Sequence, residues 1–119
     1  MAKKKKSKKK KIKRGFTSHT IRIEVDGDAV TYTHSPGDDD GRHVQVAAGD
    51  TVKWKGPKNA FAVLFGPDGS PFNELVFGGP KGGSSHVSTV LGVTGTFKYA
   101  VLAIDGSKLV TDDPDIIVT

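Results

Sequence analysis

Ten cationic side chains lie within the first 14 residues, and their chemistry is that of phosphate and other oxyanion binding. They are Lys3, Lys4, Lys5, Lys6, Lys8, Lys9, Lys10, Lys11, Lys13 and Arg14. Lysines at this density neutralise phosphates and release counterions, which gives binding without sequence preference. No aromatic residue lies among them, so base stacking is not indicated. The segment therefore predicts attachment to a polyanion, either nucleic acid or an anionic surface. The alternatives are a solubilising tail and an engineered extension.

The rest of the chain has the opposite charge balance. Eight Lys and Arg residues face 13 Asp and Glu residues, a net charge of −5, although the whole chain carries +5. Affinity for polyanions is therefore expected in the basic tail rather than in the acidic body. Within the body, Lys53, Lys55 and Lys58 form a basic cluster beside Gly56, and this cluster is the second candidate for such binding.

Four dispersed histidines are the candidates for metal binding: His19, His34, His43 and His86. The chain has no cysteine, which excludes disulfides, thiolate ligands and cysteine nucleophiles. No two of the histidines have the sequence spacing of metal ligands, so we expect ordinary surface histidines and no metal site. The alternative is a Zn²⁺ or Cu(II) site built from three of them, with His34 and His43 brought together across a hairpin.

Two other motifs resemble binding loops without matching them. The run Asp38–Gly41 lacks the alternating acids and the distal Glu of a calcium loop, so it predicts a solvated acidic loop. Such a loop could instead dock the basic tail. The Gly-rich stretch 78–85 lacks phosphate-loop spacing and no helix follows it, which predicts a flexible connection. Since no catalytic triad motif is present either, we expect no enzyme activity.

These residues must be positioned by strands, because apolar and polar residues alternate along most of the chain. Strands are predicted over 19–25, 29–33, 43–47, 51–55, 60–65, 72–77, 86–91, 96–104 and 116–119, with 72–77 either a strand or an irregular segment. Gly, Pro and Asp separate them, with Asp-Gly turns at Asp26 and Asp105. The pattern predicts an all-β, Greek-key β-sandwich of about eight or nine strands. Its predicted core is Val52, Trp54, Phe61, Val63, Phe65, Phe97, Tyr99, Val101, Ile116 and Val118.

The chain is predicted to contain one domain. Residues 1–18 are expected to be a disordered tail and residues 19–119 the folded domain. The longest apolar run, Ala60–Phe65, has six residues, far fewer than the roughly 18 that a spanning helix needs. Only Ile12 and Phe16 supply apolar side chains between the basic segment and Ile21, so no signal peptide is predicted and an intracellular, cytoplasmic location is expected.

Two segments resemble the cupredoxin family. Ala48–Trp54, followed by Phe61–Phe65, is similar to the Gly-Asp-Thr-Val-x-Trp/Phe strand of blue-copper proteins and the strand after it. Gly95–Tyr99 is similar to the Gly-x-Phe/Tyr-x-Tyr strand that precedes the copper loop, and the closing residues 113–118 look like an ending seen in bacterial cupredoxin-like proteins. The resemblance lies in Val44–Thr119 and implies the cupredoxin fold.

The copper ligands of that family do not carry over. A blue-copper site needs two His, one Cys and a weak axial ligand that is often Met. Phe61 or its neighbour occupies the position of the first His, Ala100 or Val101 that of the Cys, and Leu102–Asp115 holds no His, Cys or Met. The resemblance therefore implies a copper-free member without a cofactor, and fold alone does not give function.

Together these patterns predict a non-enzymatic binding or structural module whose basic tail attaches it to polyanions. The alternative is a metal-handling or redox protein of the same fold that has a rebuilt, histidine-based site.

Overall fold

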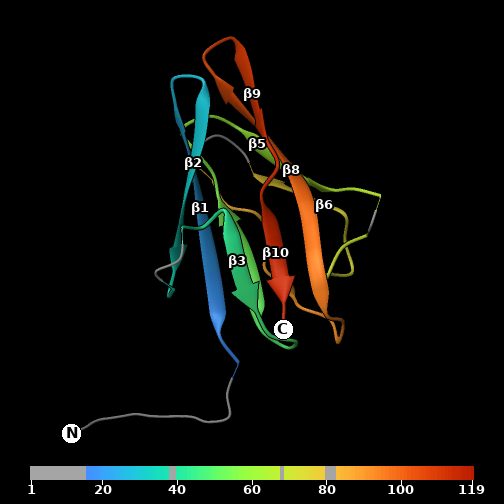
Figure 1. The fold of residues 1–119 in the computed structure, drawn as a ribbon. Coiled ribbons are helices and arrows are strands. Elements are labelled where there is room, and N and C mark those ends of the chain that lie inside the picture. Colours follow the sequence, from blue (N-terminus) through green and yellow to red (C-terminus); the bar gives the residue numbers. More distant parts are fainter. Residues whose placement is uncertain (1–15, 38–39, 68, 80–82) are drawn as a thin grey trace, which may run out of the picture.

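The protein folds into ten β-strands, and it is described by a computed structural model (Figure 1). The structure describes residues 16–37, 40–67, 69–79 and 83–119. The strands are β1 (Ser18–Asp26), β2 (Ala29–Ser35), β3 (His43–Val46), β4 (Thr51–Lys55), β5 (Phe61–Phe65), β6 (Val76–Gly79), β7 (Ser88–Thr89), β8 (Gly95–Asp105), β9 (Lys108–Asp112) and β10 (Asp115–Val118). No helix that could cross a membrane is found in this described part.

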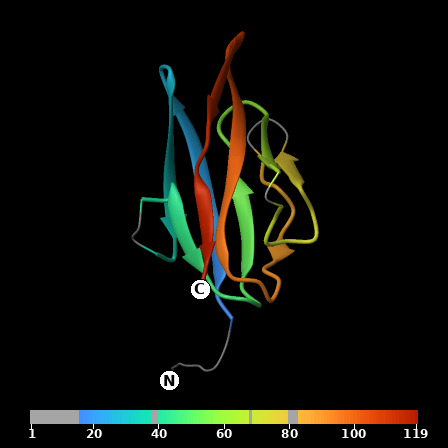
Figure 2. The same cartoon turned by 45° about the vertical axis from the view of Figure 1, so that its right-hand side comes forward.

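The strands form two sheets. The first has the order β2-β1-β4-β7, and the second has the order β3-β10-β8-β5-β6, with β9 paired to β8. Figure 2 shows that the strands of both sheets run along the long axis of the molecule. The predicted β-sandwich is confirmed.

Two parallel pairs join segments that lie far apart in the sequence. β1 runs parallel to β4, with Ile21 beside Trp54, and β10 runs parallel to β3, with Ile116 beside Val44. β1 begins and β10 ends at the same end of the sandwich (Figure 1). The start of β1, where the basic segment joins the body, is thereby fixed by a strand from the middle of the chain.

Two glycine turns set the registers of the antiparallel hairpins. Gly27 follows β1 and Gly106 follows β8, with φ angles of 64° and 67°. These left-handed angles suit glycine, which lacks the Cβ that penalises them, and they match the twist of a tight hairpin. The first turn pairs Asp26 with Ala29 and, farther along, Ile21 with His34. Both predicted Asp-Gly turns are present.

The core lies between the two sheets and is rich in aromatic rings. Trp54 is fully buried and contacts Phe65, Phe72, Phe77 and Tyr99 at ring-centroid distances of 4.9–6.1 Å. Its indole Nε1–H donates a hydrogen bond of 3.3 Å to the Tyr99 hydroxyl. A buried indole N–H needs such a partner, so this bond satisfies the polar atom of the largest core side chain.

The predicted core is confirmed except at Phe97, which is only partly buried. The strand pattern differs from the structure in two places: β7 is only two residues long, and β9 is not predicted. Both alternatives for 72–77 occur, because Phe72 lies in an irregular segment and β6 begins at Val76. Phe72 is nevertheless a core residue, because an irregular segment also places a side chain between the sheets.

Candidate functional site

The basic segment joins the body through Thr17. The ten predicted polyanion-binding residues, Lys3, Lys4, Lys5, Lys6, Lys8, Lys9, Lys10, Lys11, Lys13 and Arg14, lie outside the described residues. At Thr17 the backbone N–H donates to Oδ1 of Asp50 at 2.9 Å, and the carbonyl accepts from the N–H of Thr51 at 3.0 Å. Both backbone polar groups of Thr17 are thus hydrogen-bonded, one residue before β1 begins.

Asp50 connects this junction to the rest of the body. Its Oδ2 accepts the backbone N–H of Ala47 at 3.1 Å and Nε2–H of His19 at 2.8 Å. Burial favours a raised pKa for Asp50, but the hydrogen bonds from Thr17, His19 and Ala47 outweigh it, so the pKa is lowered. The carboxylate is therefore charged at neutral pH and ties the start of β1 to the turn before β4.

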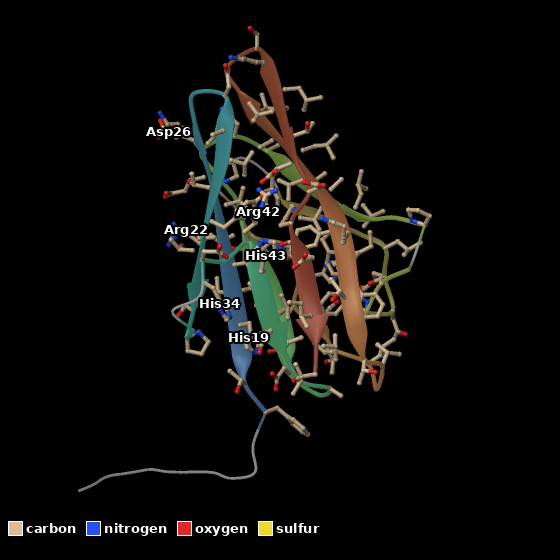
Figure 3. The ribbon with its side chains drawn as sticks, viewed as in Figure 1. His19, Arg22, Asp26, His34, Arg42 and His43 are labelled. Atoms are coloured by element: carbon tan, nitrogen blue, oxygen red, sulfur yellow. The ribbon has the colours of Figure 1, made fainter. Side chains whose placement is uncertain are left out.

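His19 links Asp50 to His34. Nδ1 of His19 lies 2.7 Å from Nε2 of His34, and both residues are buried. Because the Asp50 carboxylate only accepts, Nε2 of His19 carries a hydrogen, its Nδ1 accepts in the neutral ring, and Nε2 of His34 donates. The centroids are 5.0 Å apart and the ring planes differ by 18°, as expected for two imidazoles joined end to end. We name Asp50, His19 and His34 the histidine chain; Figure 3 labels its two histidines.

The remaining histidines each pair with a carboxylate. Nδ1 of His43 lies 3.0 Å from Oδ1 of Asp115, and Nε2 of His86 lies 2.7 Å from Oε2 of Glu74. Glu74 also accepts the Ser88 hydroxyl, and these hydrogen bonds lower the pKa of Glu74, Ser88 being the larger cause. Ser88 and His86 thus share a carboxylate, an arrangement in which the histidine is not placed as a base for the serine.

The predicted surface location of the histidines is wrong for His19 and His34. The suggested neighbour of His34 was His43, and the structure instead joins His34 to His19. Among the described residues, no three His, Asp or Glu side chains converge as a metal site. The positions that the cupredoxin resemblance assigned to ligands carry apolar side chains: Phe61 and Val101 are buried in the core, and Ala100 is half-buried.

The two loop motifs are described only in part. Asp38 and Asp39, like residues 80–82, lie outside the described residues. Oδ1 of Asp40 accepts the backbone N–H groups of Arg42 and His43 at 3.0 and 3.2 Å. Asp40 therefore caps the start of β3, which accounts for one acid of the run by local backbone bonding.

Three cations lie on the outer face of the first sheet, and a fourth lies in the turn that follows β4. Lys53 and Lys55 alternate with buried residues along β4, and the parallel register places Arg22 of β1 directly beside Lys55. Lys58 follows in the turn after β4. In the described part of the chain none of the four forms an ion pair, whereas Arg42, Lys98 and Lys108 each do. We name Arg22, Lys53, Lys55 and Lys58 the cationic strip; Figure 3 shows Arg22 pointing away from the body.

Two of the solved structures that are similar to this chain are cupredoxins. One is a purple cupredoxin from Nitrosopumilus maritimus, with 15% identity and a TM-score of 0.48, covering 87% of this chain and 99% of the other. The second is a mutant of amicyanin in a reduced Cu(I) form at pH 4, with 15% identity and a TM-score of 0.44, covering 91% of this chain and 86% of the other. The chain matches no protein-family model and no curated protein.

Proposed function

We propose that this protein is a non-enzymatic, cupredoxin-like module that binds polyanions through its basic N-terminal segment and the cationic strip. The observation that carries the proposal is the placement of the strip. β1 begins shortly after the basic segment. Arg22, Lys53 and Lys55 lie on one face of β1 and β4, and none of the three forms an ion pair with a described acidic residue. A polyanion bound by the segment can therefore extend onto the body without leaving a cationic surface.

The junction supports this role mechanically. Thr17 is held by Asp50 and Thr51, and Asp50 is held in turn by the histidine chain. Ten cations can bind a polyanion on any carrier, whereas a fixed attachment point at Thr17 keeps the basic segment close to the strip, so that one polyanion can bind both.

The test compares three full-length proteins. The first is unchanged, the second carries Gln at the ten cationic positions of the basic segment, and the third carries Lys53→Gln and Lys55→Gln. Each is titrated with a duplex DNA of fixed length and with an RNA, over a series of salt concentrations. If six to ten phosphates are neutralised, the affinity of the unchanged protein should fall roughly 10³- to 10⁵-fold between about 50 and 200 mM salt.

Substitution of the basic segment should abolish binding at moderate salt, and substitution of the strip should reduce the slope of log affinity against log salt by about 2. The matched control is Lys98→Gln with Lys108→Gln, which removes two lysines elsewhere on the body and should leave the slope nearly unchanged. Unchanged affinity after substitution of the basic segment would refute the proposal.

The rival function, a metal-handling protein with a histidine-based site, is favoured by one observation. One ring nitrogen of His19 faces His34, and the other donates to the Asp50 carboxylate. A metal-binding histidine is commonly held by a carboxylate in this second way. Titration with Cu(II) and Zn²⁺ separates the two functions. The polyanion proposal expects no tight stoichiometric site and, since the chain has no cysteine, no intense blue thiolate band. Sub-micromolar binding that is lost in His34→Ala would establish the rival.

A further inference from the structure

A polar cleft of about 920 Å³ opens at the end of the sandwich that the β1–β2 and β8–β9 hairpins form, away from Ser18, where β1 begins. Its walls come from the β1–β2 hairpin, the turn after β4 and the β8–β9 hairpin. Two contacts hold these walls together: Nδ2–H of Asn59 donates to the carbonyl of Ile104 at 3.0 Å, and Lys108 pairs with Asp28. The volume lies within the usual range of small-molecule sites, roughly 300–1,000 Å³.

Charged side chains of both signs line this cleft without neutralising one another. Arg22, Lys55 and Lys58 are the cations, and Glu24 and Asp26 are the carboxylates. None of the five forms an ion pair or a side-chain hydrogen bond with another described residue, although Arg42 and Lys98, elsewhere on the body, are paired. The cleft therefore holds acceptors and donors apart, which leaves both available to a ligand.

The positions of the charges follow from the strand register. Arg22 and Lys55 are direct neighbours in the parallel pairing of β1 and β4, about 5 Å apart at the backbone. Like charges placed directly opposite each other destabilise a sheet, and a bound anion would relieve this repulsion. Glu24 and Asp26 follow Arg22 on the same face of β1, farther toward the hairpin turn, and Figure 3 shows Arg22 and Asp26 on the same side of the strand. One end of the cleft is thus cationic and the other is acidic.

We propose that this cleft binds a phosphorylated sugar. Arg22, Lys55 and Lys58 take the phosphate, because guanidinium and ammonium groups donate charge-assisted hydrogen bonds to phosphate oxygens. Glu24 and Asp26 accept hydrogen bonds from sugar hydroxyls, as carboxylates do for ribose in nucleotide sites. Ile104 supplies an apolar wall. A bare phosphate would leave the two carboxylates facing an anion, and a neutral sugar would leave the three cations without a partner.

This inference deepens the proposed function. It rests on that function only because Arg22, Lys55 and Lys58 belong both to the cleft and to the cationic strip. The same phosphate-and-hydroxyl chemistry has two sources, a free sugar phosphate and the ribose phosphates of RNA. Lys53 offers a matched control, since it lies on the same strand and face as Lys55 but does not line the cleft.

The experiment records ¹H–¹⁵N spectra of the full-length protein during titration with ribose 5-phosphate and with inorganic phosphate, at about 150 mM salt to screen the basic segment. The amide signals of Gly56, Asn59 and Gly106, which line the cleft, report binding there. A second arm titrates a short single-stranded RNA and the DNA of the same sequence. If ribose 5-phosphate shifts the cleft signals and RNA does not, the ligand is a free sugar phosphate. If RNA also shifts them and DNA does not, the cleft binds the ribose phosphates of RNA as well.

We expect ribose 5-phosphate to shift the cleft signals. Arg22→Gln and Lys55→Gln should each weaken binding about fivefold or more, and Lys53→Gln less than about twofold. Glu24→Gln should tighten inorganic phosphate but weaken ribose 5-phosphate, so that the ratio of the two affinities falls about fivefold. Unmoved cleft signals, equal losses in Lys53→Gln and Lys55→Gln, or equal tightening of both ligands by Glu24→Gln would each overturn the inference.

The protein with a Gln-substituted basic segment separates this inference from the proposed function. Cleft binding that persists while nucleic-acid binding is lost supports both the cleft and the segment. Nucleic-acid binding that survives this substitution refutes the proposed function and leaves the cleft to be judged by its own variants.

Discussion

Nδ1 of His19 lies 2.7 Å from Nε2 of His34, and the hydrogen bond between them completes a chain that ends at the carboxylate of Asp50. All three side chains are almost fully buried. A buried polar chain stabilises a fold only when each member has its partner, because the low local dielectric penalises an unpaired group. The chain therefore acts as one unit that joins β1, β2 and the turn before β4.

Replacement of the middle member should be costly. In His19→Ala, the Asp50 carboxylate loses a donor and His34 loses its acceptor, so the free energy of unfolding should fall by about 2–3 kcal/mol. Urea denaturation followed by circular dichroism measures this. The matched control is His86→Ala, which removes an exposed histidine paired with Glu74 and should cost under about 1 kcal/mol. Equal losses in the two variants would contradict the role of the chain.

The lowered pKa of Asp50 predicts a loss of stability in acid. As the pH falls, the carboxylate in the unfolded chain takes up its proton first, so protonation favours unfolding. This contribution is present above the usual pKa of Asp and is lost as the pH falls through the lower pKa of the folded state. Asp50→Asn should be less stable than the unchanged protein at pH 6, and the difference should shrink in acid. Denaturation curves at several pH values test this, and a difference that does not depend on pH would contradict it.

Both tyrosines should resist ionisation in alkali. Burial raises the pKa of Tyr99, and burial together with the hydrogen bond to Asp112 raises that of Tyr32. No phenolate absorbance should therefore develop near the usual tyrosine pKa of about 10 while the protein is folded. Since the unfolded chain loses these protons first, stability should fall as the pH rises above that value. One tyrosine ionising normally in folded protein, in a spectrophotometric titration, would refute this prediction.

Trp54 should be the most costly single side chain to remove. It is fully buried among four aromatic rings and donates to Tyr99, so Trp54→Ala should lower the free energy of unfolding by about 3–5 kcal/mol. Trp54→Phe keeps much of the ring contact and should cost less. Circular dichroism is the appropriate measurement, because both variants lack the only tryptophan. A loss below about 1 kcal/mol in Trp54→Ala would contradict the described core.

Much of the fold follows from local pattern. Alternation along 19–25, 51–55 and 96–104 predicts β1, β4 and β8, and the Asp-Gly turn predicts the first hairpin. β9 is not predicted, because a strand with partly apolar outward residues lacks a clear two-residue period. For 72–77 the pattern leaves a strand and an irregular segment open, and the structure places Phe72 outside β6. Phe97 fits the alternation of inward and outward residues, but it lies near the start of β8 and is only partly buried.

The histidine chain could have been predicted in part. A two-residue turn at Gly27 fixes the register that places Ile21 beside His34, and His19 shares the inward face with Ile21. The burial and proximity of the two histidines were therefore implicit in the sequence. Asp50 and the pairing of Arg22 with Lys55 depend on the parallel contact of β1 with β4, which joins residues about 30 positions apart and has no local signal.

The parallel pairs also impose an order of events during synthesis. β3 has β10 as its strand partner within the described residues, and β10 follows β3 by about 70 residues. The second sheet therefore cannot close until β10 has left the ribosome. The ten cations of the basic segment precede every described strand, so they are made before the sandwich can form. Translation itself thus offers a nascent, tethered form of this protein before the sandwich exists.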